Sequence, residues 1–382
     1  MKLIYLANAR IPTEKAHGIQ IMQMLKAFAN SKLNPPADGQ NSKPKIELII
    51  PRRYNKIKVD SFEYYGVERI FKIKKLPCMD LIPLGLPKIG FLVQTFTFLV
   101  SAKIYLLFKK YDFFYTREQL AGLFFQNFIL ELHYLPKKIT FWHRKSWQSA
   151  QKIITINNFI KDKIIENGVE GDKILVAPDG VDLEKFQIKE SQVECRKKLN
   201  LPLDKKIVLY AGHLYQWKGG DVLAQATRFL PVDVETYFVG GTIEDVKKFK
   251  IQNSKSKIQV IGHRPYAEIP YWLAAADVLV LPNSASEKIS SHYTSPLKLF
   301  EYMASGRPIV ASNLPSLGEI LNQNNAILVK PDDPDSLAQG IILALQKSEN
   351  LAKVAAQARL EANGFSWQKR AENIINFIKF ST

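Results

Sequence analysis

Short apolar runs alternate with longer amphipathic runs along most of this chain of 382 residues. A short, wholly apolar run predicts a buried strand, and apolar positions about three to four residues apart predict a helix. Strands that alternate with helices throughout form a parallel, doubly wound sheet, so the pattern predicts an α/β fold. In the first half, the predicted strands are 2–7, 45–50, 111–117, 128–133 and the apolar starts of 150–169 and 173–182, and the first helix is 19–30.

A charged stretch, 183–206, interrupts this alternation before it resumes. The second half has predicted strands at 207–212, 234–241, 258–263, 277–282, 308–311 and 326–330, and predicted helices at 219–230, 268–276, 297–305 and 334–346. We therefore predict two Rossmann-like domains, over 1–185 and 186–365. A last amphipathic helix, within 366–382, can pack on either domain, and we expect it to return to the first.

The net charge of +17 is concentrated in the first half of the chain. Residues 1–190 contain 30 Lys and Arg against 18 Asp and Glu, whereas residues 191–382 contain 23 against 18. This imbalance indicates an anionic partner, either nucleic acid, a phosphorylated substrate or an anionic membrane surface, although scattered lysines also merely solvate a surface. The only two cysteines are far apart, which favours a reducing, cytoplasmic location.

One segment, 89–108, is apolar enough to resemble a membrane-spanning helix. It contains Gln94 and Lys103, and lysines flank it on both sides. We therefore predict one or two helices that are buried or lie against a membrane, with peripheral contact to anionic lipid on the inner face of the membrane as the corresponding location.

Two lysines stand near predicted helix starts in the second half. Lys218 lies in the loop "HLYQWKGGD" after one strand, and Lys298 lies in the first turn of the helix that begins at Leu297. A lysine near a helix N-terminus is unfavourable unless an anion is present, and a diphosphate accounts for both. Alternatively, each lysine extends to solvent.

Glu301 follows Lys298 by three residues and lies on the same helix face. Its carboxylate either pairs with that lysine or accepts hydrogen bonds from a ribose diol, as acidic residues do in nucleotide sites. In the first half, Arg117 and His133 end neighbouring strands, where a neutral imidazole can donate to a sugar hydroxyl or stabilise developing charge. No metal-binding spacing or nucleophile elbow occurs, so we predict neither a metal nor a cofactor.

The combination of "YAGHLYQWKGGDVLAQA", "VIGHRPYAEIPYWLAAADVLVLPN" and "SPLKLFEYMASGRPIVASNLPSLGEIL" resembles glycosyltransferase family 4. The resemblance extends over nearly the whole chain. It implies the GT-B fold, two Rossmann-like domains that face a central cleft. It also implies a retaining hexosyltransferase that moves a sugar from a UDP- or GDP-sugar to a hydroxyl acceptor, a glycan or a lipid-linked molecule, without a metal.

The resemblance also implies site residues. His133 and Lys218 take the catalytic roles at the sugar and the departing diphosphate. The implied donor-binding residues are Gly18, His213, Lys218, Arg264, Leu297, Lys298 and Glu301. His213 stands where the family usually has arginine, and Tyr293 stands where it has a glutamate that contacts the donor sugar. Glu287 or His292 can substitute for that glutamate from the same loop.

Two other functions compete with this one. The first is a non-catalytic GT-B relative that binds nucleotide or glycan and has lost the sugar site along with the glutamate at position 293. The second is nucleic-acid binding through the positive charge. The basic residues lack the interleaved aromatics of single-strand binders, and no helix-turn-helix or zinc spacing appears, so we expect no nucleic-acid partner. A pyridoxal-phosphate phosphorylase of the same architecture requires a much longer chain.

Overall fold

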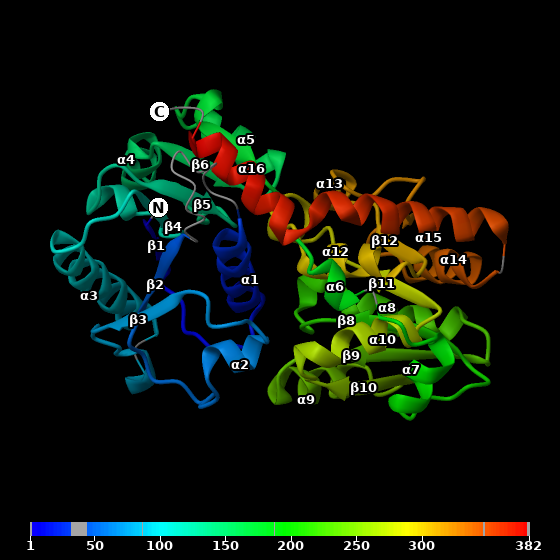
Figure 1. The fold of residues 1–382 in the computed structure, drawn as a ribbon. Helices are drawn as coiled ribbons and strands as arrows, with labels where there is room; N and C mark the ends of the chain where they lie inside the picture. Colours follow the sequence, from blue (N-terminus) through cyan, green and yellow to red (C-terminus); the bar gives the residue numbers. More distant parts are fainter. Residues whose placement is uncertain (1, 32–43, 86, 187, 347, 380–382) are drawn as a thin grey trace. The chain divides into compact units, whose positions relative to one another are not determined.

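The computed structural model forms two compact units (Figure 1). The described residues are 2–31, 44–85, 87–186, 188–346 and 348–379. Unit 1 comprises Met1–Pro178 with Trp367–Thr382, and unit 2 comprises Asp179–Ser366. Most of the polar insertion 31–44 lies outside the described residues.

The first boundary between the units lies earlier than the predicted 185/186. The backbone N–H of Val181 donates to the carbonyl of Phe365 at 2.9 Å, which ties the segment after Asp179 to the end of unit 2. Val181 and Phe186 are also part of the unit 2 core. Residues 179–185 therefore fold with the second unit.

Unit 1 is built on a parallel sheet whose described strands have the order β3-β2-β1-β4-β5-β6-β7. The strands are β1 (Lys2–Leu6), β2 (Lys45–Pro51), β3 (Lys72–Leu76), β4 (Phe113–Thr116), β5 (Ile129–Leu132), β6 (Lys152–Thr155) and β7 (Ile174–Val176). The helices are α1 (Ala16–Asn30), α2 (Ser61–Tyr65), α3 (Pro87–Leu107), α4 (Phe141–Ser149), α5 (Asn158–Ile165) and α16 (Trp367–Lys379), with the short turns η1 (Ile82–Leu84), η2 (Ala121–Leu123) and η3 (Gly171–Lys173).

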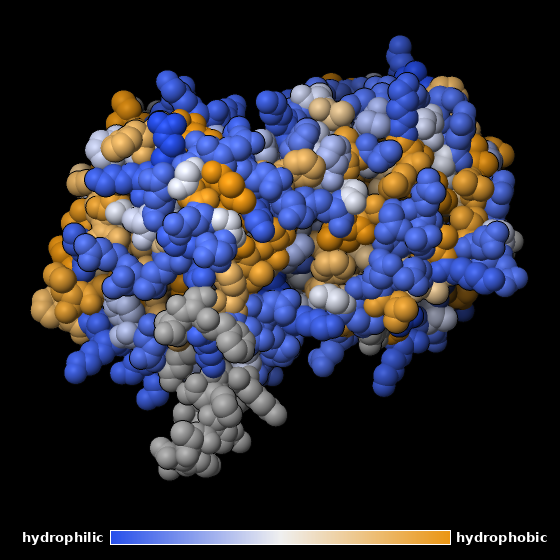
Figure 2. Space-filling view, turned by 90° about the horizontal axis from the view of Figure 1, so that it is seen from above, coloured by the Kyte–Doolittle hydropathy of each residue, from blue (hydrophilic) through white to orange (hydrophobic). Residues whose placement is uncertain are grey.

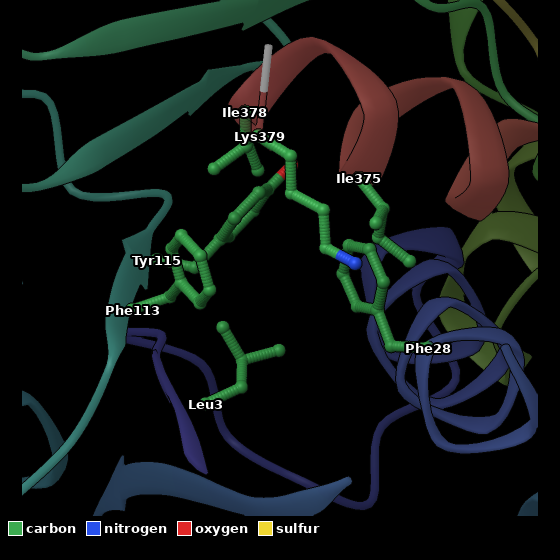
Figure 3. Close-up of a pocket in the computed structure, with 7 residues that line it drawn as sticks. All are labelled: Leu3, Phe28, Phe113, Tyr115, Ile375, Ile378 and Lys379. Atoms are coloured by element: carbon green, nitrogen blue, oxygen red, sulfur yellow. The ribbon is translucent and has the colours of Figure 1, made fainter. Parts of the chain in front are cut away.

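The last helix, α16, packs on unit 1 beside α1, as the sequence allows (Figure 1). Figure 3 shows Ile375 and Ile378 of α16 on one side of a small apolar pocket, with Phe28 of α1 and Tyr115 of β4 also lining it. Arg370, on the same helix, is buried. The helix therefore contributes both apolar surface and a charge to the interior of unit 1.

Unit 2 is built on a second parallel sheet, whose described strands have the order β10-β9-β8-β11-β12-β13. The strands are β8 (Lys206–Ala211), β9 (Val234–Val239), β10 (Ile258–Gly262), β11 (Val278–Leu281), β12 (Ile309–Ser312) and β13 (Ile327–Val329). The helices are α6 (Leu183–Phe186), α7 (Gln192–Lys198), α8 (Gly220–Ala226), α9 (Ile243–Gln252), α10 (Ile269–Ala275), α11 (Lys288–Ser291), α12 (Leu297–Ser305), α13 (Pro315–Gly318), α14 (Pro334–Leu345) and α15 (Glu349–Ala362), with the turns η4 (Gln216–Lys218), η5 (Thr227–Phe229), η6 (Tyr266–Glu268) and η7 (Asn363–Phe365).

Helices cover both faces of the unit 2 sheet, which explains why its central strands are almost wholly apolar. Ile207 and Leu209 of β8 join the cluster that contains Phe300 of α12. Val208 and Tyr210, which point to the opposite face, join the cluster that contains Ile341 of α14. Alternate residues of one strand thus enter two separate cores, as expected of a parallel sheet in an α/β protein.

The strand order reverses between β8 and β11. From β8 the chain continues outward through β9 and β10, and from β11 it continues in the other direction. In open α/β sheets, ligands bind at such a switch point, beyond the carboxyl ends of the strands. The loops that follow β8 and β11 are therefore the place in unit 2 to look for a site.

Candidate functional site

The loops after β8 and β11 pack directly against each other at this switch point. The carbonyl of Trp217 accepts from the backbone N–H of Ser284 at 3.0 Å and from the hydroxyl of Ser290 at 3.1 Å. Gly219 lies in the left-handed region at φ 71°, and a Cβ there would collide with the carbonyl oxygen of Pro282. A glycine is required at this position because the two loops approach too closely for a side chain.

Lys298 extends from the first turn of α12 into the protein. Its side chain is only 6% exposed, and its ammonium lies 3.9 Å from the centroid of the Tyr210 ring. Among the described residues, Lys298 Nζ has no hydrogen-bond acceptor. A buried ammonium with no acceptor is costly, because the aromatic face replaces only part of its lost hydration.

Lys218 ends the turn η4, immediately before Gly219 and α8. Burial lowers the pKa of Lys218 to about 8, and the charge of Glu301 opposes this shift. Burial also lowers the pKa of Lys298 well below its usual value, and the positive charge of Lys218 lowers it further. The charge of Lys218 therefore disfavours the protonated form of Lys298, and an anion beside Lys298 would offset that effect.

Glu301 lies one turn further along α12 and is only 7% exposed. Its Oε1 accepts from the Tyr266 hydroxyl at 2.8 Å. Burial raises the pKa of Glu301 to about 7, while that hydrogen bond and the charges of Lys185, Lys218 and Lys298 act in the opposite direction. Because Lys298 Nζ has no acceptor, the intrahelical salt bridge that the sequence allows is not formed.

Three other predicted donor-binding residues of unit 2 have local contacts of their own. The His213 ring stacks on Tyr215, with centroids 5.0 Å apart, and its Nδ1 lies 3.8 Å from Asp245 Oδ2. Arg264 is exposed, with its Nε 3.9 Å from Glu268 Oε2. Leu297 is the first residue of α12.

The loop predicted to contact the donor sugar contains the short helix α11. Glu287 caps the start of α11, and its side chain is exposed. His292 ends the helix, with its Nδ1 2.8 Å from the Ser291 hydroxyl. Tyr293 is partly buried beside His292, at 6.1 Å between ring centroids. Neither Glu287 nor His292 therefore occupies a buried position of the kind that Glu301 has.

Three residues at this site were not among those predicted. Tyr210 lies under Lys298, Tyr266 positions Glu301, and Asn283 is fully buried directly after β11. Both polar atoms of the Asn283 amide are without a hydrogen-bond partner among the described residues. A polar residue that ends a strand at the switch point is the sequence signal that would have identified Asn283.

In unit 1, the structure gathers His17, Arg117 and His133 at the carboxyl edge of the sheet. Arg117 follows β4, His133 follows β5, and His17 opens α1 after β1, and these three strands are adjacent. Burial, followed by the charge of Arg117, lowers the pKa of His17 to about 3. The charge on His133 contributes to the same shift, so the side chains share one local environment.

A buried carboxylate orients His133. Glu131 is 2% exposed, and its Oε1 lies 2.9 Å from His133 Nε2 and 2.6 Å from Arg370 Nη2. Its Oε2 accepts from the Tyr5 hydroxyl at 2.9 Å. Burial raises the pKa of Glu131, but the charges of Arg370 and His133 outweigh burial and hold it well below the usual value. The carboxylate therefore accepts from Nε2–H, which fixes the imidazole ring.

Gly18 has a packing role in the structure. Its backbone N–H donates to the Lys15 carbonyl at 3.0 Å. A Cβ at this position would collide with the Tyr65 hydroxyl, which bonds both the N–H and the carbonyl of Thr13. The glycine thus allows the start of α1 to approach α2 closely, and the Gly18 amide is already engaged within unit 1.

No group of three or more His, Cys, Asp or Glu side chains with metal-binding geometry occurs in the part of the chain that the structure describes.

These two units have the fold of a known class. The structure aligns with a sucrose-phosphate synthase from Thermosynechococcus elongatus at a TM-score of 0.77 and 18% identity, over 100% of this chain and 99% of that chain. It aligns with the Anabaena protein HepE in complex with UDP at a TM-score of 0.74 and 17% identity, over all of both chains. At such identities, the likeness shows the fold alone. The predicted GT-B class, with two Rossmann-like units, is confirmed.

Sequence relatives give a more particular resemblance. Residues 205–347 match the family model described as "Glycosyl transferases group 1". A D-inositol 3-phosphate glycosyltransferase of Xylanimonas cellulosilytica is 29% identical over 223 residues, which are 55% of this chain and 52% of that protein. The O-antigen chain mannosyltransferase B of Escherichia coli is 25% identical over 264 residues, 65% of this chain and 64% of that protein. The chain spans about half the length of the curated relatives it matches.

Proposed function

We propose that this chain is a glycosyltransferase that transfers a sugar from a nucleotide diphosphate donor, a UDP- or GDP-sugar, to a hydroxyl acceptor on a glycan or a lipid-linked molecule. The observation that carries the proposal is Lys298, a buried amine that has no hydrogen-bond acceptor among the described residues and whose pKa is lowered further by the charge of Lys218. The match to glycosyl transferases group 1 covers the part of unit 2 that contains both lysines and supports this chemistry.

The proposed donor site assigns one function to each group. The diphosphate lies between Lys218 and Lys298, and its oxygens accept hydrogen bonds from the free backbone N–H groups at the start of α12. The Glu301 carboxylate accepts from the ribose diol, and the Tyr266 hydroxyl holds it in place. The base borders the loop that contains Arg264. We infer UDP or GDP because a purine and a pyrimidine both satisfy this arrangement.

The proposed mechanism follows from where charge develops. When the anomeric C–O bond breaks, the sugar becomes an oxocarbenium-like centre and the departing diphosphate gains negative charge. Lys218 and Lys298 stabilise that charge more strongly in the transition state than in the ground state. The Nε2–H of His133 donates to Glu131, so only Nδ1 is left for the sugar. That nitrogen accepts from a sugar hydroxyl when the imidazole is neutral and donates to the developing charge when the ring is protonated. These residues supply the required positive charge, so we infer that no metal ion is needed.

The resemblance to family 4 supports transfer with retention of the anomeric configuration. The configuration of the product, measured by proton NMR immediately after transfer, tests this point. An inverted product would contradict the retaining mechanism and leave the donor site intact.

The decisive experiment compares Lys218→Ala with wild-type protein. We expect the variant to lose about 100- to 1000-fold in kcat/KM for donor hydrolysis or transfer, as when other charge-stabilising donors are removed from an active site. Lys353→Ala, which removes an exposed lysine from the same unit, is the matched control and keeps wild-type kinetics. Wild-type kinetics in Lys218→Ala would remove this lysine from the proposed site.

One observation favours a second function, a non-catalytic protein that binds nucleotide. Tyr293 replaces the expected carboxylate, and Glu287 is exposed instead of buried near Lys298. This alternative predicts that UDP or GDP raises the melting temperature although no UDP- or GDP-sugar is hydrolysed or transferred. Release of free nucleotide from any such donor would exclude it.

A further inference from the structure

The helix α3 divides sharply into an inner and an outer face. Its inner face contains buried residues at four-residue spacing, which are Gly90, Gln94, Phe98, Ala102 and Leu106, together with the buried Leu99. Gln94 donates to Asn8 Oδ1 at 2.9 Å, and the Tyr105 hydroxyl donates to Glu47 at 2.7 Å. These hydrogen bonds and the buried residues hold the inner face of α3 against unit 1.

The outer face of α3 is apolar and exposed. Leu92 is 67% exposed, Phe96 60% and Leu107 72%, and Phe108 just beyond the helix is 83% exposed. Ile89, Phe91 and Ile104 are also exposed. Isolated exposed apolar residues are ordinary, but a continuous stripe along a whole helix marks a contact surface.

This surface continues from α3 onto α4. The Phe96 ring contacts Phe124 at 5.9 Å, and Leu123 beside it shares a hollow with Trp142 of α4. Phe141 and Trp142, at the start of α4, are 58% and 54% exposed. Figure 2 shows hydrophobic side chains gathered at the left edge, the side on which Figure 1 places α3. We define the α3–α4 face as the exposed residues of 88–110, Leu123 and the exposed residues of 137–145.

The charge around this face is of one sign. Segments 87–110, 120–128 and 134–149 contain no Asp or Glu. Their Lys and Arg residues, all exposed, are Lys88, Lys103, Lys109, Lys110, Lys137, Lys138, Arg144 and Lys145. An apolar stripe bordered only by cations, with aromatic rings at one end, has the composition of a helix that lies in the interface of an anionic membrane.

We propose that the α3–α4 face docks unit 1 on the surface of an anionic bilayer. In length and composition, the segment Lys88–Leu107 could cross a membrane, but a third of it is buried in unit 1. The helix would have to leave the sheet and expose Phe98 and Ala102 in order to span. It therefore lies in the plane of the interface, with its outer residues in the lipid and its lysines at the headgroups.

A second copy of this chain fits the face less well than lipid. A twofold dimer through the face would place its eight cations opposite the same eight cations of the partner. Like charges in such an interface repel, whereas an anionic lipid surface attracts every one of them. Charge complementarity therefore selects the membrane.

The test is sedimentation of the full chain with vesicles, either of phosphatidylcholine alone or of equal parts phosphatidylcholine and phosphatidylglycerol. We expect binding to the anionic vesicles that weakens at high salt. The variant Leu92→Ser/Phe96→Ser/Leu107→Ser should lower the bound fraction about tenfold or more, because three apolar side chains leave the lipid. Lys103→Glu/Lys145→Glu should lower it on anionic vesicles alone.

Matched controls are changes of the same type in unit 2. Val232→Ser/Ile243→Ser alters two side chains that are 88% and 90% exposed, and Lys248→Glu/Lys255→Glu alters two exposed lysines. Both controls should bind vesicles like wild type. Equal binding by the serine variant and its control, or a wild-type dimer on gel filtration that the variant disrupts without any vesicle binding, would overturn the proposal. The readout does not involve nucleotide, so Lys218→Ala should still bind vesicles even if the proposed function fails.

Discussion

The amine of Lys298 is buried, and burial of a charged amine is unfavourable because it removes the hydration that the group has in water. Tyr210 offers an aromatic face, and Glu301 is engaged by Tyr266 instead. The fold therefore maintains an unfavourable group that only a ligand relieves. At sites of this kind, a residue that binds ligand lowers the stability of the ligand-free protein, and substitution of a single residue measures both effects.

Replacing Lys298 with methionine should separate the two effects. We expect Lys298→Met to stabilise the ligand-free protein by about 1–3 kcal/mol, because an apolar side chain of similar length replaces a buried polar one. It should also abolish the rise in melting temperature caused by UDP or GDP. Thermal unfolding with and without nucleotide measures both, and Lys353→Met, at an exposed position, should change neither. A destabilised variant would contradict this reading of Lys298.

The pH dependence of nucleotide binding follows from the shifted pKa values of three groups, and the lowered pKa of Lys298 acts in the same direction as that of Lys218. Lys218, with a pKa of about 8, loses its proton as pH rises through that value, so affinity for the diphosphate should fall. Glu301, with a pKa raised to about 7, becomes protonated as pH falls through that value and can no longer accept from the ribose at both oxygens. Affinity should therefore be greatest between about pH 7 and 8.

Isothermal titration calorimetry with UDP or GDP, from about pH 5.5 to about pH 9.5, measures this dependence, because Lys218 and Glu301 both titrate within that range. Glu301→Gln should bind more weakly at every pH and lose most of the decline below pH 7, because the amide does not titrate. If the affinity of Glu301→Gln declined below pH 7 as much as that of the wild type, the decline would come from protonation of the ligand phosphates instead of Glu301.

At the scale of elements, one close approach of two loops fixes the site. Gly219→Ala should destabilise unit 2 by about 1–3 kcal/mol, because φ 71° and the carbonyl of Pro282 both disfavour a Cβ. It should also weaken nucleotide binding, because the adjacent Lys218 moves with the loop. Chemical denaturation and nucleotide titration measure the two effects. The control Gly318→Ala adds a Cβ where nothing lies within 4 Å and should leave both unchanged.

The sequence pattern predicted the strands better than the helices. The short apolar runs that the pattern assigned to strands do form strands, because burial on both faces favours apolar residues along them. The longest apolar run, 89–108, lies mainly in the helix α3. The elements that the pattern did not reveal include the strand β3 and the helices α2, α4, α7, α9 and α15. The helix α7 begins at a capping box of Ser191 and Glu194 within a stretch that appeared only as charged. Its local capping signal was present in the sequence, but its packing against α10 was not.

At the scale of the whole molecule, the chain leaves unit 1 once and returns to it at the end. Arg370 of α16 donates to Glu131 at 2.6 Å and to the Pro178 carbonyl at 2.9 Å. The return of the chain therefore supplies the cation for a buried carboxylate on β5. A buried pair that loses one partner leaves an unpaired charge, which is far more costly than the intact pair is favourable.

Arg370→Met should therefore destabilise unit 1 by about 3–5 kcal/mol and leave unit 2 folded. Hydrogen exchange should speed up in β4, β5 and α1 but remain unchanged in β8, β11 and α12. UDP or GDP should still protect the loops after β8 and β11. The adjacent exposed Lys369→Met is the control and should exchange like wild type. Equal acceleration in both units would show that the arginine stabilises the chain as one cooperative body.

The sequence by itself determined the two-unit α/β fold and the segments after β8 and β11 from which Lys218, Lys298 and Glu301 come. It did so because periodicity and the position of a residue at the end of a parallel strand are local properties. Only the tertiary structure decided that Lys298 has no acceptor, that Tyr266 takes the carboxylate of Glu301, and that Arg370 reaches Glu131 from the far end of the chain. Those outcomes depend on which side chains of distant segments are in contact and on how much water remains around them. The local pattern of apolar and polar residues determines neither the contacts nor the hydration.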